Sequence, residues 1–406
     1  MVGLHLNVSK TVVVPLYNYV EETIRSPITL HSPDWGGVAI AGAAKYLGFY
    51  VGPGRRHMSW EGPLQKYINR AKLWGKQGLG MLLTIQAYQV YICSVLQFVA
   101  QLEPLHPEFE QMERKAVQAL FPGPTAWIVP TMLKDAYSLH LPLPLVDMKA
   151  VSTAAKVRVL RWENRAEGGL HVLQRVRCLL DNPSEECGLN HWQWCQEWGR
   201  NSFFTYLRDA DQEMREKLRS NPCADLRLQE KPAFQKKIAR LCRSTTPGDA
   251  CFHLRRRLDK WKLIILPGHR TERAVRILEV LKNHSTPRVQ ASFLRTVCNG
   301  WCTRSRYQGV GGCLFGCGRG EDKLAHFATC GVVSVMMHNG IHLPCPRGTG
   351  ALDSFLCMDT TDEDTIVARC KGLYALYRLY NGIRHHAFIQ NEFQDAFNRY
   401  LQEARA

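Results

Sequence analysis

Three cysteines and one histidine near the C-terminal end of the chain have the spacing of a metal site. Three residues separate Cys313 from Cys317, and three separate His326 from Cys330, so the pattern is C-x3-C-x8-H-x3-C. Thiolate and imidazole ligands favour Zn²⁺, and four protein ligands complete a structural site without an open catalytic position. The sequence therefore predicts a structural zinc knuckle with Cys313, Cys317, His326 and Cys330 as ligands.

The residues around this pattern suit a compact knuckle. Glycines that permit tight turns follow the first ligand, at Gly316, Gly318 and Gly320. Cys298 and Cys302 have the same three-residue separation and are competing candidate ligands. The intervening Asn299, Gly300 and Trp301 favour a turn that packs against the knuckle instead.

The second candidate feature is a concentration of positive charge. The net charge is +16, and residues 151–310 hold 30 Lys and Arg against 16 Asp and Glu. Cations at helical spacing neutralise phosphates, and nearby aromatic rings such as Trp162, Trp261, Trp301 and Tyr307 can stack on unpaired bases. We therefore predict an RNA or DNA partner, bound by Arg158, Arg161, Arg255, Arg256, Arg257, Lys260, Lys262, Arg304 and Arg306. A merely solubilising charged face is the alternative.

No catalytic residue is predicted. The chain has no G-x-S-x-G, no G-x4-G-K-[ST] and no H-E-x-x-H pattern. An acidic cluster could hold Mg²⁺ in a nuclease, but no suitably spaced lysine accompanies it: Asp359, Asp362, Glu363 and Asp364. Acidic residues before a helix are ordinary N-terminal caps, which is the interpretation we favour here.

Cysteine usage and hydropathy bear on the compartment. Fifteen cysteines is an odd number, and the N-terminus lacks the pattern of a signal peptide. We expect an intracellular protein, nuclear or cytoplasmic and not secreted. The uncharged segment 79–99 is long enough to span a bilayer, but glutamines recur through it and its apolar residues follow helical spacing. A buried amphipathic helix is favoured over a membrane anchor, so no membrane partner is expected.

The pattern along the chain predicts a mainly α, multi-domain protein. Strands are expected at 4–14 and 45–51, where β-branched and aromatic residues end at Pro15 and at Gly52. Helical periodicity dominates from Pro63 onward. The expected helices are 63–77, 79–102, 107–121, 149–163, 170–180, 188–208, 210–219, 230–243, 250–263, 270–283 and 287–298, followed by a helical hairpin near 362–402.

These residues together resemble the reverse transcriptase of non-LTR (LINE-type) retrotransposons, from the late palm onward. Residues 3–14 resemble the motif after the catalytic hairpin, and residues 45–52 resemble the later palm strand pair. The helical region 60–120 is similar to the thumb. Residues 298–330 resemble the zinc-binding element, and Leu379–His385 resembles the helical tail after it. The match is specific at 3–14, 45–52 and 298–330 and loose elsewhere.

The departures from that family concern the catalytic centre. Its metal-binding aspartates precede the position of Gly3, and no Tyr-Ala-Asp-Asp or similar pair occurs in this chain. Lys10, which in the family lies near the incoming nucleotide, has no catalytic centre to serve. The resemblance therefore implies a nucleic-acid-binding part of such a protein without polymerase activity, because no paired carboxylates form a two-metal site.

The resulting organisation has five parts. Residues 1–58 are a small β remnant of a polymerase palm, 59–148 a thumb-like helical bundle, 149–297 a basic helical region, 298–335 the zinc knuckle, and 336–406 a C-terminal helical hairpin. The alternative function is a zinc-stabilised scaffold that binds another protein through the Tyr- and Leu-rich hairpin at 366–388. Phosphate contacts would weaken with salt, whereas apolar docking would not.

Overall fold

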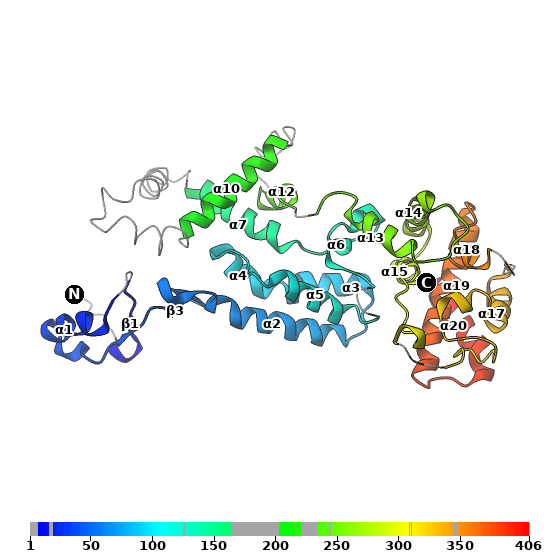
Figure 1. The fold of residues 1–406 in the computed structure, drawn as a ribbon, viewed down its shortest axis with the longest axis horizontal. Coiled ribbons are helices and arrows are strands. Elements are labelled where there is room, and N and C mark those ends of the chain that lie inside the picture. The colour runs from blue at the N-terminus through cyan, green and yellow to red at the C-terminus, as the bar shows by residue number, and fades with distance from the viewer. Residues whose placement is uncertain are drawn as a thin grey trace. The chain divides into compact units, whose positions relative to one another are not determined.

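The chain is mostly helical and forms two compact units. The computed structural model describes residues 7–15, 19–124, 127–163, 203–220, 234–243, 245–307, 309, 311–343, 348 and 350–405, and the remainder is grey in Figure 1. The first unit comprises Met1–Tyr67, Cys93–Phe109 and Asp147–Ser244, and the second comprises Ile68–Ile92, Glu110–Val146 and Thr245–Ala406. The five predicted parts remain a prediction.

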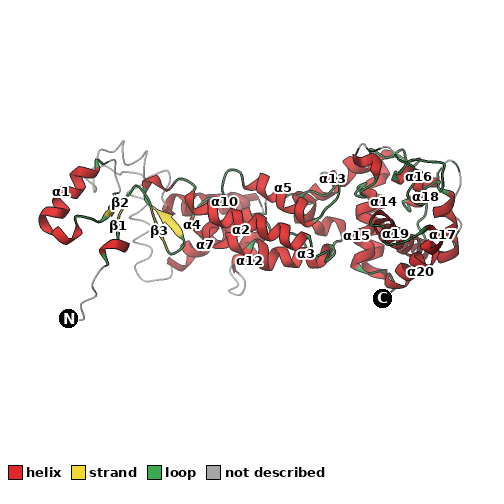
Figure 2. Ribbon diagram, turned by 90° about the horizontal axis from the view of Figure 1, so that it is seen from below, coloured by secondary structure: helices red, strands yellow, loops and turns green. Residues whose placement is uncertain are grey.

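The few strands in the described residues lie in the first unit, in yellow in Figure 2. Strand β1 (Val12–Val13) pairs in parallel with β2 (Ala39–Ile40). The helix α1 (Glu21–His31) lies between them in sequence and was not predicted. None of its described side chains is buried, so the apolar periodicity that predicts a helix is weak there.

The segment 45–51 forms a hairpin, as the resemblance to a strand pair implies, and not the single strand that the residue pattern predicts. Strands β3 (Ala44–Tyr46) and β4 (Phe49–Val51) pair antiparallel, with Lys45 opposite Tyr50. Leu47 and Gly48 connect them with φ of 46° and 96°. Two positive φ values in a two-residue loop match the twist of a tight hairpin, and Gly48 adopts that conformation without strain.

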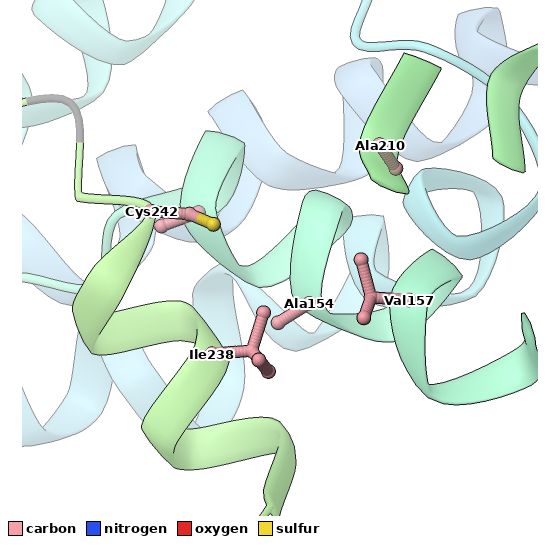
Figure 3. Close-up of a cluster of buried hydrophobic side chains, with 6 residues drawn as sticks. Ala154, Val157, Ala210, Ile238 and Cys242 are labelled. Carbon is pink, nitrogen blue, oxygen red and sulfur yellow. The ribbon is translucent and has the colours of Figure 1, made fainter. Parts of the chain in front are cut away.

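Three helices of the first unit pack around α7 (Met148–Glu163). It contacts α4 (Ser94–Leu102), α10 (Phe203–Ser220) and α12 (Phe234–Leu241). Figure 3 shows the small side chains that permit this close packing, with Ile238 of α12 beside Ala154 of α7 and Cys242 just past the end of α12. Helix α2 (Met58–Gly75) is divided between the two units.

The buried Lys156 ties α7 to the end of α4. Its Nζ donates to the carbonyl oxygens of Ala100 and Glu103, at 3.1 and 2.9 Å, and to Ser152 Oγ at 2.6 Å. A cation at a helix C-terminus is favourable for the helix dipole. Burial nevertheless lowers the pKa of Lys156 to about 8, against an opposing effect of Glu213 and Glu103.

The second unit consists mainly of helices. They are α3 (Met81–Ala87), α5 (Phe109–Leu120), α6 (Pro130–Lys134), α13 (Asp249–Leu258), α14 (Pro267–His284), α15 (Pro287–Val297), α16 (Leu324–Phe327), α17 (Gly331–Ile341), α18 (Ala351–Phe355), α19 (Glu363–Arg384) and α20 (Phe393–Glu403). Helix α19 contacts α14, α15, α17 and α20, and these helices gather around it in Figure 1. The predicted C-terminal hairpin is α19 and α20.

Helix boundaries differ from the predictions where packing overrides periodicity. The expected helices 188–208 and 210–219 correspond, where described, to the continuous α10, whereas 170–180 lies outside the described residues. The expected helix 79–102 is broken into α3, a π-helical turn (Tyr88–Ile92) and α4. A π turn inserts one extra residue, which rotates the apolar face that follows it.

The segment 79–102 buries the side chains that its periodicity selects. Ile85, Tyr88, Ile92, Leu96 and Val99 are at most 2% exposed, as expected for an amphipathic helix. Among the described helices, none alone is long and apolar enough to cross a membrane. One bent pair, Met81–Ile92 with Ser94–Leu102, passes that test by length and composition only.

The buried Lys156 predicts a specific pH dependence of stability. The protonated form is disfavoured in the folded state, so stability is reduced below pH 8 and recovers between pH 8 and 10.5, where the unfolded lysine is still protonated. At 1.36 kcal/mol per pKa unit, the free energy of unfolding of the wild type relative to Lys156→Met should rise by on the order of 3 kcal/mol over this window.

The measurement is urea unfolding of both proteins at several pH values. The difference between them is needed because burial also raises the pKa of Cys242, to about 12, which lowers stability above pH 9 in both proteins. The exposed Lys149 on the same helix provides the control, and Lys149→Met should show no such trend. A difference that stays flat from pH 7 to 11 would contradict the burial of a charged Lys156.

Candidate metal centre and basic surfaces

The four predicted ligands converge on one point. The ligand atoms of Cys313, Cys317, His326 and Cys330 all lie within 4.8 Å of one another. Cys313 Sγ lies 3.9 Å from Cys330 Sγ, and Cys317 Sγ lies 3.2 Å from His326 Nε2. In a tetrahedral site with bonds of about 2.3 Å, two sulfurs lie about 3.8 Å apart. These residues could therefore hold a metal ion.

A small β-bridge and glycine turns position the first two ligands. Gly312 pairs with Glu321, and Cys313 N donates to Gly320 O at 2.8 Å. Gly316 and Gly318 on either side of Cys317 have φ of 75° and 67°, which only glycine adopts without strain. The chain therefore reverses direction around Cys317 and returns next to Cys313.

Gly320 also sets the position of the imidazole ligand. A Cβ at this position would lie 2.2 Å from Cε1 and Nδ1 of His326. The backbone of Gly320 thus lies directly against the ring, while His326 is carried by the short helix α16. The glycine is required by this close approach and not by its backbone conformation.

The fourth ligand stands at the start of a helix. Cys330 is the N-cap residue of α17, so its side chain lies at the end of the helix that carries the free backbone N–H groups of Val332 and Val333. The neighbouring Cys313 thiol, together with these N–H groups, lowers the pKa of Cys330. A helix N-terminus and hydrogen-bond donors favour the thiolate, which is the form that binds metal.

An aromatic cluster supports the segment from Cys313 to Cys330, which we call the metal loop. Trp301, Phe315, Phe327 and Tyr380 are all at most 1% exposed. The Phe315 and Phe327 rings meet edge to face at 5.0 Å, and Tyr380 lies 5.4 to 6.0 Å from the other three rings. Since Tyr380 belongs to α19, this cluster packs the loop onto the central helix of the unit.

A buried carboxylate joins the metal loop to an exposed basic turn. Asp322 Oδ2 accepts hydrogen bonds from Tyr380 Oη at 2.9 Å and from the backbone N of Arg304 at 2.7 Å. Asp322 is 1% exposed. Arg304 begins the 3-10 turn Arg304–Tyr307, in which all four side chains are exposed. We call these four residues the arginine turn.

The structure places most of the predicted basic residues at the surface. Arg255, Arg256, Lys260, Lys262, Arg304 and Arg306 are exposed, and Arg257 is partly buried. These seven lie in the second unit. Arg158 is exposed in the first unit and donates to Gln101 Oε1 at 3.2 Å. The side chains of Arg161 and Trp162 lie outside the described residues.

The prediction that exposed aromatic rings stack on bases is partly wrong. Trp261 and Trp301 are 8% and 0% exposed, because their indole N–H groups are used inside the unit by Val297 O and Thr296 Oγ1. Neither ring faces solvent, so that expectation is wrong for both. Tyr307 is 59% exposed, as predicted.

One exposed aromatic was missed. Phe252 on α13 is 59% exposed and precedes Arg255 and Arg256 by three and four residues, which places them on one helix face. We call these three residues, together with Lys260 in the turn just after the helix, the basic face of α13. The helical spacing of Phe252 to these arginines is the sequence signal that could have identified it.

The competing sites do not form among the described residues. Cys298 is fully buried and is not part of the metal-ligand group. The residues of the acidic cluster instead cap a helix or form ion pairs with arginines. Asp362 caps α19 by accepting from Thr365 N at 2.9 Å, Asp359 pairs with Arg369 at 2.8 Å, and Glu363 pairs with Arg276 at 2.8 Å.

Comparisons with protein-family models, with curated proteins and with solved structures found no match to this chain. The resemblance to retrotransposon reverse transcriptases therefore stays a prediction.

Gly320 provides a test of the metal centre that leaves every ligand in place. In Gly320→Ala the new methyl group overlaps the His326 ring, so the metal affinity should fall by about 10–100-fold, the size seen for residues that orient ligands. Competition for zinc with a chromophoric chelator measures it. Gly331→Ala is the matched control, because a Cβ there meets no atom within 4 Å.

Loss of the ligands themselves gives the upper limit of this effect. Cys317→Ser and His326→Ala should each lower the zinc affinity by more than Gly320→Ala does, since only three protein ligands then hold the ion. If Gly320→Ala and Gly331→Ala bind zinc equally well, the geometry of the His326 side of the site is wrong.

The hydrogen bond between Tyr380 and Asp322 is expected to stabilise the second unit. In Tyr380→Phe the buried carboxylate loses one donor, which costs about 1–3 kcal/mol of unfolding free energy. Denaturant unfolding of the metal-loaded protein measures the cost. Tyr307→Phe removes a hydroxyl from an exposed ring and should change stability by less than about 0.5 kcal/mol. Equal effects would show that the Asp322 contact contributes nothing.

Proposed function

We propose that the second unit is a zinc-stabilised module that binds RNA or DNA. The observation that carries this proposal is the arginine turn: its backbone is fastened to the metal loop through Asp322, while Arg304, Arg306 and Tyr307 remain exposed. A metal ion that orders the loop would also order the turn. The metal would then act as a structural support for a charged binding surface.

Two surfaces supply the contacts in this proposal. In each, cations that can neutralise phosphates accompany an exposed ring that can stack on a base: Tyr307 in the arginine turn and Phe252 on the basic face of α13. Backbone contacts of this kind bind without strong sequence preference. The concentration of positive charge in residues 151–310 supports the same partner.

Zinc is the metal proposed for the site. Three thiolates and one imidazole form a soft, tetrahedral donor set. Such a set binds Zn²⁺ in preference to Mg²⁺ or Ca²⁺. Four protein ligands leave no position for water, so the proposed role of the ion is structural. Cys313, Cys317 and Cys330 would bind as thiolates, and His326 through Nε2.

The proposed origin is the post-catalytic part of a non-LTR retrotransposon reverse transcriptase. Two observations support it beyond the motifs: residues 44–51 form a strand pair, and residues 298–330 form a compact Cys3His loop against a helix. No polymerase activity is proposed for this chain. We expect no nucleotide incorporation in a primer-extension assay with Mg²⁺.

The rival function is a scaffold that binds protein through residues 366–388. Helix α19, which makes up most of this segment, exposes little apolar surface. The apolar side chains of that helix are already used inside the unit, with Ile366, Leu373, Leu376, Leu379 and Tyr380 at most 1% exposed. A helix face that is covered by its own neighbours offers little surface on which another protein could dock. The nucleic-acid proposal uses exposed residues instead.

The proposal is tested by titrating the zinc-loaded chain with single-stranded RNA at several salt concentrations. The affinity should fall steeply with salt, and Arg304→Gln/Arg306→Gln should flatten the log–log salt slope by about 0.7 for each phosphate that is no longer neutralised. Arg399→Gln/Arg405→Gln removes the same charge from exposed positions on α20 and just after it, and is the control.

Removal of zinc by a chelator should weaken RNA binding as strongly as the arginine-turn variant does. Binding that is insensitive to salt, or that the two double variants lower equally, would refute the proposed surface. Zinc binding without any RNA or DNA binding would leave only the structural role of the metal.

A further inference from the structure

Two large aliphatic side chains protrude from the loop between α13 and α14. Ile264 and Leu266 are 66% and 67% exposed, although their neighbours Trp261 and Leu263 are buried. Single exposed apolar residues are common on protein surfaces and need no explanation. Here the two stand in one loop, which we call the 261–266 loop. The backbone of this loop is held by several hydrogen bonds to buried side chains.

Buried charged groups hold this loop from both sides. Arg270 is 8% exposed and donates from Nη2 to Leu263 O at 2.8 Å, from Nε to Ile265 O at 2.9 Å and from Nη1 to Trp261 O at 3.5 Å. Asp353 is 5% exposed and accepts from the backbone N atoms of Ile264 and Ile265 at 3.0 to 3.1 Å.

The side chain of Trp261 forms a further hydrogen bond that holds the loop. Its indole N–H donates to Val297 O at 2.7 Å, which anchors the start of the loop to the end of α15. A mobile loop could fold its aliphatic side chains onto the surface, but a loop with these contacts cannot. The exposed Ile264 and Leu266 are therefore preorganised, which reduces the entropic cost of inserting them into a partner.

The charges beside the protruding side chains indicate the partner. Lys260 and Lys262 are both exposed, and Lys262 lies two residues from Ile264. A pair of exposed aliphatic side chains preceded by two exposed lysines matches the chemistry of a DNA duplex that is kinked by insertion. Aliphatic residues enter between two base steps from the minor groove, while cations contact the phosphates on either side.

We propose that the 261–266 loop is a wedge that inserts Ile264 and Leu266 between stacked base pairs of duplex DNA. The inference rests on the proposed nucleic-acid binding and adds a mode of contact to it. Lys260 and Lys262 neutralise the adjacent phosphates. Asp353 and Arg270 are positioning residues that hold the loop open and touch no base.

The test uses the zinc-loaded full chain and a short DNA duplex that contains 2-aminopurine, whose fluorescence rises when it is unstacked. Wild type should bind and raise the fluorescence several-fold at one or more positions of the probe base. Ile264→Ser/Leu266→Ser should bind within about threefold of wild type at low salt, with the same salt slope, and lose the fluorescence change.

The matched control is Val335→Ser/Ile389→Ser, which removes two aliphatic side chains that are 56% and 63% exposed elsewhere in the same unit. It should unstack the probe as wild type does. Thermal unfolding should be unchanged in both double variants, because all four side chains are exposed. Asp353→Asn should weaken the fluorescence change more than the affinity, because it loosens the loop and removes no contact to DNA.

Each failure has a distinct signature. An unstacking signal that persists in Ile264→Ser/Leu266→Ser overturns the wedge, and so does wild-type binding without any signal. If wild type shows no salt-sensitive binding to DNA or RNA, the proposed function itself fails. If the same variant instead abolishes binding to anionic phospholipid vesicles while DNA stays stacked, the loop is a membrane contact and the wedge is refuted.

Discussion

The buried carboxylate of Asp322 is the contact on which the organisation of the second unit depends. It lies in the metal loop and accepts from Tyr380 of α19 and from the backbone of the arginine turn. Three segments that are distant in sequence therefore meet at one oxygen atom. A buried carboxylate is costly to desolvate, and hydrogen bonds from fixed donors offset that cost. The metal loop, the central helix and the exposed turn are coupled through this one group.

Charged side chains that hydrogen-bond to backbone groups also hold other loops in the described residues. Asp353 and Arg270 fasten the 261–266 loop, and Asp135 accepts from the backbone N atoms of Gly248 and Ala250 at the start of α13. In the first unit, Lys156 holds the carbonyl oxygens at the end of α4. Each of these buried or half-buried charges bonds to backbone groups, so it fixes the path of a loop whatever side chains that loop exposes.

This arrangement separates rigidity from surface chemistry. The arginine turn, the basic face of α13 and the 261–266 loop all expose charged or apolar side chains on a backbone that is held from inside. A rigid surface loses little conformational entropy when it binds. The proposed metal would add to this rigidity, because four ligands would order the turns between Cys313 and Cys330 in addition to the buried Phe315 and Phe327.

The sequence alone determined the candidate ligand set, the helical class and much of the apolar face of residues 79–102. Each of these follows from local spacing, since thiols separated by three residues and apolar residues three or four positions apart must lie near one another in a turn or helix. Sequence alone did not determine which aromatic rings face solvent. Trp261 and Trp301 have basic neighbours as Phe252 does, but only the two indoles meet an acceptor inside the unit.

Tertiary structure likewise decided the break in 79–102 and the exposure of Ile264 and Leu266. The π turn rotates one apolar face relative to the next, and the loop stays open because Asp353 and Arg270 arrive from later in the chain. Local spacing carries no information about partners almost ninety residues away, such as Ile264 and Asp353. Burial is a property of those long-range neighbours, and for this reason it appears only when the chain has folded.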